Sequence, residues 1–364
     1  MNEIKLSVLT VEEKYKYDPA ETVYGGGDGI VTWGLNNDVP KLLSNCYDKS
    51  ATLKAAIDQS INYVLGDGVE IHPDAGVWLT QVNRRGQTMK DILDHITFDY
   101  YIYGNFAIQV IYNKMGNPVE LYALDVSKCR LSQDKNKVYY SSKTWTKYQT
   151  KADVYDRVGY ADKIDPEKRT QIYFYNGTGI RTVYNKSPWN AALDDVLTEV
   201  EGSRYSLNSV VNGFSARYII NIPDTANLTD EQKKGIEDSI KNKFCGTDTT
   251  SNFMVYFSND EDKYIEVRKI EANEDPEHFQ VIRNGARENI FVSLRISPLL
   301  CGLSSLANTG FSTQEFSDSF KLFDRTVAEP VRHIMENAIE KVTGIKNCIR
   351  IKPFQITFDN QESK

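Results

Sequence analysis

The feature that most constrains the fold is a change of pattern near Pro188, about halfway along the 364-residue chain. Before it, residues 106–185 contain short runs rich in Tyr, Val and Ile, separated by polar turns, which predict a β-sheet. After it, residues 188–217 carry apolar side chains at helical spacing over about seven turns. A helix of that length packs against partners. The sequence therefore predicts an α+β protein built from more than one packed unit.

The N-terminal part predicts two helices that pack with this sheet. Residues 50–65 and 88–103 carry apolar side chains at helical spacing, and a glycine follows each stretch as a stop signal. Residues 1–40 are expected to form an irregular arm with a glycine-rich loop at 24–30. No Lys-Ser or Lys-Thr pair follows these glycines, so they do not predict a phosphate-binding loop.

The part after the long helix predicts a small insert and then a returning helix. Within residues 218–274, Thr229 and Gln232 have the spacing of a capping box that starts a helix, and strands flank it. Acidic residues outnumber basic residues in this insert. Residues 276–294 return to helical spacing.

The C-terminal part predicts a loop followed by a long helix with a proline inside it. Residues 296–310 contain one proline and two glycines and are not expected to form one regular element. A second capping box, Ser312 with Glu315, starts the last helix. Pro330 removes a backbone donor inside this helix, so we expect a kink or bend there. Residues 348–358 read as a final strand.

The sequence contains no strong motif for catalysis, and it predicts no cofactor and no bound metal. Its four histidines have no metal-ligand spacing, and its five cysteines form no C-x-x-C pair, which favours reduced thiols. No long apolar run or signal peptide is present, so we expect no membrane span. One acidic cluster is interleaved with Lys and Arg and is interpreted as a solvated loop, with a metal-dependent nuclease as the alternative. The cluster contains Asp153, Asp156, Asp162 and Asp165.

The charge of the chain bears on nucleic-acid binding. The formal net charge is −7, whereas a protein that holds DNA by its phosphates usually presents a basic surface. The chain therefore either never meets nucleic acid or meets it without gripping it. The 22 tyrosines, against 4 tryptophans, favour a protein that assembles with other chains.

The order of elements and five short phrases resemble the portal proteins of tailed double-stranded DNA phages. Residues 288–303, ENIFVSLRISPLLCGL, are similar to the phrase that precedes the channel loop in that family. Residues 103–130 resemble a phrase of the family's sheet, and residues 228–232, LTDEQ, match one in its insert. Single positions that match are Ile296, Pro298, Leu299, Leu300, Gly302, Asn308, Glu315 and Pro330, with Val327 in place of the usual Leu.

The resemblance implies a portal fold divided into named parts. It has an α+β wing, long stem helices, a small α/β clip insert, a tunnel loop and a long kinked helix. The crown of helices found in many members is expected to be short or absent. The implied ranges are 1–185 for the wing, 186–217 and 275–295 for the stem, 218–274 for the clip, 296–311 for the tunnel loop, 312–344 for the kinked wing helix, and 345–364 for the terminal strand and tail.

The resemblance also implies which residues lie at the DNA channel. Arg295, together with Arg287, contacts phosphate or else bridges neighbouring subunits. The leucines line a constriction or else pack between neighbouring loops, and Pro330 marks the kinked helix. The channel and tunnel-loop candidates are Arg295, Leu299, Leu300, Leu303, Ser304, Ser305, Leu306 and Asn308.

The function that the resemblance implies is structural and not enzymatic. Copies of the chain form a ring, about twelve subunits in the virion, at one capsid vertex. The ring conducts double-stranded DNA during packaging and ejection, and an acidic wall keeps the duplex centred. Expected partners are the terminase large subunit, the head–tail adaptor, and the major capsid protein or scaffold. Assembly takes place in the host cytoplasm. Another head–tail connector or capsid-associated protein is the alternative.

Overall fold

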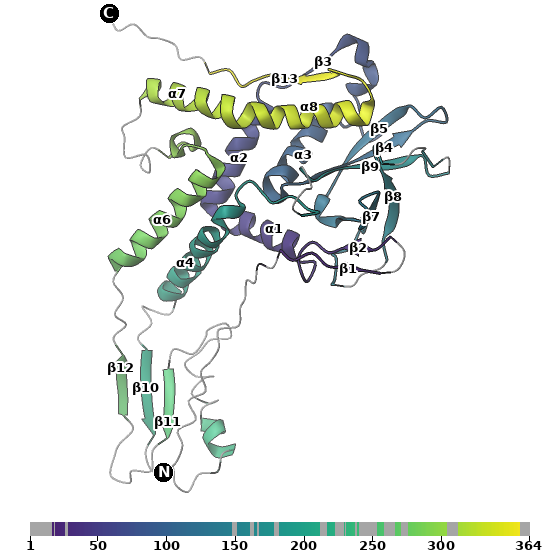
Figure 1. The fold of residues 1–364 in the computed structure, drawn as a ribbon. Coiled ribbons are helices and arrows are strands. Elements are labelled where there is room, and N and C mark those ends of the chain that lie inside the picture. The colour runs from purple at the N-terminus through teal and green to yellow at the C-terminus, as the bar shows by residue number, and fades with distance from the viewer. Residues whose placement is uncertain are drawn as a thin grey trace, which may run out of the picture. The chain divides into compact units, whose positions relative to one another are not determined.

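The computed structural model divides the chain into two compact units, which are described separately (Figure 1). The larger unit comprises Met1–Val196 and Arg287–Lys364, and the smaller comprises Leu197–Ala286. None of the described helices is long and apolar enough to cross a membrane. The described residues are 17, 19–25, 28–147, 151–160, 164–165, 167–177, 182–211, 217–222, 229, 231–236, 239, 253–257, 266–270, 276–303 and 312–356.

The larger unit contains the predicted sheet, which has six strands in the order β5-β4-β9-β8-β7-β6. Its neighbouring strands are antiparallel except for the parallel pair β8–β9. The strands are β4 (Phe106–Tyr112), β5 (Pro118–Leu124), β6 (Cys129–Leu131), β7 (Lys137–Tyr140), β8 (Asp153–Arg157) and β9 (Thr170–Tyr175). β4 and β5 form an antiparallel hairpin. Residues 153–157, which we expected in a solvated loop, form an internal strand instead, because their main chain pairs with β7 and β9.

Three helices of the N-terminal part pack together and against this sheet. They are α1 (Val39–Lys49), α2 (Ala51–Leu65) and α3 (Met89–Tyr103), and α3 contacts β4 and β5. The two predicted helices are confirmed as α2 and α3, whereas α1 was not predicted. Thr88 and Asp91 form a capping box at the start of α3, and Ser50 caps α2. Burial of apolar side chains such as Ile96 and Leu93 contributes about 1.5–3 kcal/mol each.

Two small strand pairs lie at the margins of the larger unit. β1 (Val23–Tyr24) and β2 (Ile30–Val31) form a hairpin within the segment that we expected to be irregular. An isolated bridge from Ile30 to Ser132 joins this hairpin to the β6 end of the sheet. β3 (Val69–Ile71) pairs antiparallel with β13 (Ile349–Ile351), so the predicted final strand exists but is shorter than expected.

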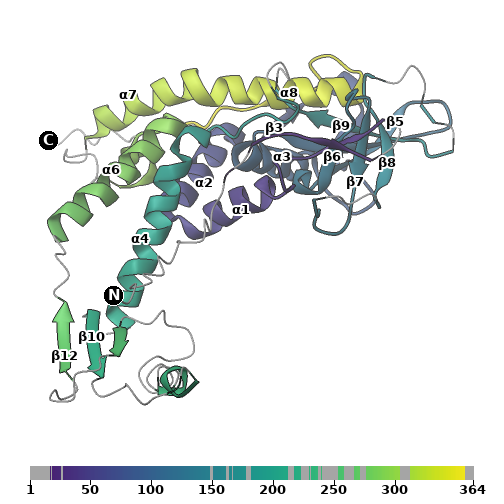
Figure 2. The same ribbon diagram turned by 60° about the horizontal axis from the view of Figure 1, so that its bottom comes forward.

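The C-terminal part of the larger unit contains a long rod of helix, which β13 follows (Figures 1 and 2). It consists of α7 (Thr313–Phe323), a π-helix (Asp324–Ala328) and α8 (Glu329–Thr343). The backbone N–H of Glu329 donates to the carbonyl of Asp324, five residues earlier. Pro330 follows directly, and a proline leaves the carbonyl four residues before it without a backbone donor. We expected a kink or bend at Pro330; the structure has a π-turn directly before it, and the rod runs on past this point in both views.

Two further helices span the boundary between the units. α4 (Leu193–Val211) begins later than predicted because the residues before it form a short 3₁₀ helix, Asn190–Ala192. The buried Trp189 holds that start in place, since its ring N–H donates to the carbonyl of Tyr101 at 3.0 Å. α6 (Pro276–Leu294) is the predicted returning helix.

The smaller unit contains a three-stranded sheet in the order β11-β10-β12. The strands are β10 (Arg217–Ile222), β11 (Phe253–Phe257) and β12 (Glu266–Ile270). β10 pairs parallel with β11 and antiparallel with β12, so the two later strands flank it and do not pair with each other. The predicted capping box is confirmed, because Thr229 and Gln232 exchange both bonds at the start of the helix over 231–236.

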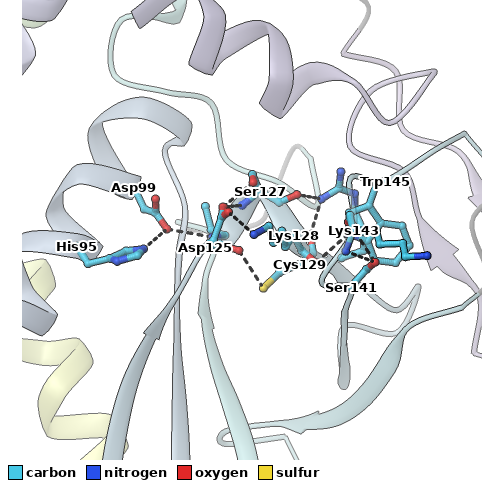
Figure 3. A network of polar contacts seen from close by, with 11 residues as sticks. His95, Asp99, Asp125, Ser127, Lys128, Cys129, Ser141, Lys143 and Trp145 are labelled. Carbon is cyan, nitrogen blue, oxygen red and sulfur yellow. Dashed lines mark hydrogen bonds and ion pairs between the residues drawn. The ribbon is translucent and has the colours of Figure 1, made fainter. Parts of the chain in front are cut away.

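A polar network around the buried Asp99 connects α3 to the sheet (Figure 3). The Asp99 carboxylate accepts a hydrogen bond from the backbone N–H of Val126 at 3.0 Å, and His95 lies 3.7 Å from the same oxygen. Burial raises the pKa of Asp99 well above its usual value and lowers the pKa of His95. Asp125, beside them, accepts from Ser127 and pairs with Lys128 at 3.3 Å. This network fixes the start of β6 on α3.

Candidate channel segment and its anchors

The end of α6 leads into the segment that we expected at the DNA channel. The N–H of Ile296 donates to the carbonyl of Phe291 at 3.2 Å, and that of Arg295 donates to Val292 at 3.0 Å. These two bonds form a Schellman cap, in which the residue at the turn adopts the left-handed conformation. That residue is Arg295, with φ of 56°, where glycine is the usual choice. Its side chain is exposed.

The first part of the predicted loop is a short 3₁₀ helix, η5 (Pro298–Cys301). The Ser297 hydroxyl caps it by accepting from the N–H of Leu299 at 3.3 Å. Leu299 and Leu300, which we expected at the channel, are each only 3% exposed and belong to the core of the larger unit. The physical reason is that η5 packs against α2 and α7, so its two leucines point inward. Leu303 is half-buried and remains a candidate.

The remaining tunnel-loop candidates lie outside the described residues. These are Ser304, Ser305, Leu306 and Asn308. The described chain resumes at Ser312, whose hydroxyl accepts from the N–H of Glu315 at 3.4 Å at the start of α7. The structure therefore describes the two flanks of the predicted loop, η5 and α7.

Both flanks contact one tyrosine of α2. Tyr63 is 3% exposed, and its hydroxyl donates to the carbonyl of Leu300 in η5 at 2.9 Å. Its ring lies 5.2 Å from that of Phe320 and 5.7 Å from that of Phe323, both on α7. Burial raises the pKa of Tyr63, so the hydroxyl keeps its proton as a donor. Sequence reasoning assigned Tyr63 no role, because its partners are more than 200 residues away along the chain.

A buried arginine connects α8 to the same end of α2. Arg332 is 5% exposed, and its guanidinium donates to the carbonyls of Val64 at 3.0 Å and Tyr63 at 3.2 Å. It also forms an ion pair with Asp324, the first residue of the π-helix. A positive charge is favourable at the C-terminus of a helix, where carbonyls lack partners. Arg332 thereby fixes the π-turn on α2.

The acidic cluster considered as a metal site is only partly assembled. Asp156 and Asp165 line a surface cavity together with Lys137 and Lys168. Asp162 lies outside the described residues. Over the described ranges, no group of three or more His, Cys, Asp or Glu side chains has the arrangement of a metal site.

Comparison with known proteins was made by sequence profile and by fold. A profile of the phage portal protein family matches residues 63–359. A search of curated proteins found no match.

Solved structures share the fold at low sequence identity. A chain of the virion of a native gene transfer agent particle aligns with a TM-score of 0.54 and 14% identity, over 93% of this chain and 86% of that chain. A chain from the neck of the native particle, computed with C12 symmetry, gives 0.53 and 14%, over 86% and 83%. The crystal structure of an HK97 family phage portal protein from Corynebacterium diphtheriae gives 0.55 and 10%, over 85% and 94%.

These comparisons confirm two predictions from the sequence. The fold is α+β and matches that of a portal protein. Portal proteins are structural, so the family also confirms the prediction that the chain is not an enzyme. The profile match extends from α2 to beyond β13 and includes both flanks of the channel segment. Because this match covers residues 63–359 of 364, the chain belongs to the phage portal protein family.

Proposed function

We propose that this chain is one subunit of a ring at a single capsid vertex of a phage virion, and that the ring conducts double-stranded DNA during packaging and ejection. Membership of the portal family supports the assignment, as does the fold shared with a chain from a neck of C12 symmetry. A ring of identical subunits closes through a head-to-tail interface, which requires each subunit to present two different surfaces.

The observation that carries the proposal is the location of exposed apolar side chains. Among the described residues, half of the large apolar side chains that are exposed lie on just three helices, α4, α6 and α7. Val281 is 67% exposed and Val292 is 72% exposed. An apolar face exposed along one helix, as on α6, favours a surface that another chain covers. The set is Tyr205, Leu207, Val281, Ile282, Val292 and Leu322.

Aspartate substitutions on α6 test this interface. Val281→Asp and Val292→Asp each place a charge where a neighbouring subunit would exclude water, so we expect rings to be replaced by monomers. Val77→Asp is the matched control, because Val77 is 85% exposed but lies on a different element, the 3₁₀ helix Val77–Leu79. Electron microscopy and light-scattering mass report assembly, and circular dichroism reports folding. Rings that persist in both α6 variants at wild-type concentration would contradict the interface.

The roles of the wing, stem and clip within the subunit are assigned from the portal resemblance. The α+β part over 1–185 serves as the wing, with the rod of α7 and α8. α4 and α6 serve as stem helices, and the three-stranded unit with β10 serves as the clip. The wing contacts the major capsid protein or scaffold, and the clip docks the terminase large subunit and later the head–tail adaptor.

Charge changes on the clip test this docking role. Glu231→Lys and Lys234→Glu alter exposed side chains of the helix over 231–236. We expect altered terminase binding with unchanged subunit folding, because exposed charges steer association and contribute little to stability. Binding constants measured on assembled wild-type and variant rings are the readout. Unaltered terminase binding in both variants would argue against docking at this helix.

The DNA channel is assigned to the segment between η5 and α7. Deletion of Ser304–Thr309 is expected to leave ring assembly intact and to block DNA packaging or retention. A Gly-Ser replacement of the same length is the control for chain connectivity. Leu303 and Ser312 are the described residues that flank this segment, and Arg295 is the exposed candidate that precedes η5. Loss of the ring on deletion would show that the segment serves assembly instead. The net charge of −7 suits a channel along which DNA slides.

A further inference from the structure

Tyr63 holds together the two described elements that flank the proposed channel segment. We propose that Tyr63 is a positioning residue of the DNA channel and that it fixes η5 and α7 at a set distance from each other. This proposal rests on the proposed function. The residue lies on α2 and takes no part in the apolar surface proposed for ring closure. Its effect on DNA is therefore separable from ring assembly.

The hydroxyl of Tyr63 fixes the first flank. It is the donor to the backbone carbonyl of Leu300, and both groups are buried. A buried carbonyl that loses its donor is strongly disfavoured, so this bond opposes any displacement of η5 from α2. The bond acts on the main chain, and it therefore holds η5 whatever side chains η5 carries.

The ring of Tyr63 fixes the second flank, α7, and its main chain contacts α8. The ring meets Phe320 and Phe323 of α7 edge-on, with interplanar angles of 61° in both pairs. Such edge-to-face contacts favour one mutual orientation of the two rings. The carbonyl of Tyr63 accepts from Arg332 of α8. Three elements, η5, α7 and α8, thus take their position from one residue.

A single-atom substitution isolates the contact to η5. Tyr63→Phe removes the hydroxyl and keeps the ring, and Tyr112→Phe is the control, since its buried hydroxyl donates to Gln171 elsewhere in the sheet. The readout is hydrogen exchange of the amides that close η5, those of Gly302 and Leu303, which donate to the carbonyls of Leu299 and Pro298. We expect about fivefold faster exchange in Tyr63→Phe and no change in Tyr112→Phe, since one hydrogen bond contributes about 1 kcal/mol.

The thiol of Cys301 gives a second readout of the same displacement. Cys301 lies in η5 and is half-buried, and its reaction with a soluble thiol reagent can be followed by mass spectrometry of its peptide. We expect faster labelling in Tyr63→Phe than in the wild type and in Tyr112→Phe. Equal labelling and equal amide exchange in all three proteins would overturn the proposal.

The functional readout is the fraction of particles that retain their DNA after packaging with variant rings. We expect Tyr63→Phe to form rings in wild-type yield but to retain DNA in fewer particles. Faster η5 exchange with wild-type retention would overturn the link to the channel. Absence of rings in the wild type itself would refute the proposed function. In that case, amide hydrogen exchange measured on the single subunit would still decide whether Tyr63 holds η5 in place.

Discussion

Arg295 occupies a backbone conformation that its side chain disfavours, and this allows its backbone and its side chain to be tested separately. With φ of 56°, the residue at the end of α6 lies in the left-handed region. An L-residue other than glycine is disfavoured there by about 1–2 kcal/mol. The cap bonds of Arg295 and Ile296 are made by the main chain, so any residue that tolerates this φ keeps them.

We compare Arg295→Gly with Arg295→Ala, because both remove the guanidinium and only glycine relieves the backbone. Arg295→Gly is expected to be more stable than Arg295→Ala by about 1 kcal/mol. With an m-value of roughly 3 kcal/mol/M in urea, this is a difference of about 0.3 M in the unfolding midpoint. The assay is urea unfolding of the subunit, followed by circular dichroism.

The same pair of variants reports on the function of the side chain. If the guanidinium contacts DNA phosphate or a neighbouring subunit, both variants lose DNA retention or ring yield to the same extent, whatever their difference in stability. Equal unfolding midpoints for the two variants would refute the argument from backbone strain. An Arg295→Gly subunit clearly less stable than the wild type would show that the side chain supports the subunit itself.

Three further changes test the internal contacts of the subunit. Arg332→Met is expected to lower the free energy of unfolding by about 3 kcal/mol, because it leaves the charge of Asp324 and the helix carbonyls without their donor. Arg325→Met, which breaks the exposed pair with Glu329, is expected to change the free energy of unfolding by less than about 1 kcal/mol. Burial raises the pKa of Asp99, so its carboxyl group stays protonated to higher pH in the folded chain than in the unfolded chain. The contribution of this group to the stability of the fold is therefore lost as the pH rises above about 4. Asp99→Asn removes that loss, so the unfolding free energy of the variant relative to the wild type is expected to rise between pH 4 and pH 8. Gly66→Ala is expected to destabilise by at least about 2 kcal/mol, since its Cβ would lie 1.9 Å from the carbonyl oxygen of Lys352. Gly116→Ala, whose Cβ would make only an ordinary contact with Ile164 at 3.8 Å, is expected to cost about 1 kcal/mol in thermal or urea unfolding.

The sequence predicted those parts of the fold whose signals are local. The helices α2 and α3 were predictable from their apolar spacing and a glycine after each, and Thr229 with Gln232 marked the helix of the smaller unit. α1 was missed because its apolar residues follow an expected irregular arm and its start carries no side-chain cap. β8 was missed because three of its five residues are charged, and it is a strand only through its neighbours β7 and β9.

The site was less predictable than the fold because its contacts are distant in sequence. The phrase around Pro298 predicted where the channel segment lies, but not the inward direction of Leu299 and Leu300, which depends on packing against α2. Tyr63 and Arg332 carried no signal, because a tyrosine and an arginine in amphipathic helices are usual surface-facing residues. Their roles follow only once α8 lies against α2.

The π-turn before Pro330 sets how far α8 is rotated about the helix axis relative to α7, although the two run on as one rod. Phe320 and Arg332 are twelve residues apart, which in a regular helix is about 120° away from a whole number of turns. One surplus residue turns everything beyond it by about 100°. The π-turn takes up that surplus, so Phe320 and Arg332 can both face α2. The number of residues between the two helices is therefore more tightly constrained than their identity, and a one-residue deletion there would rotate one helix away from α2.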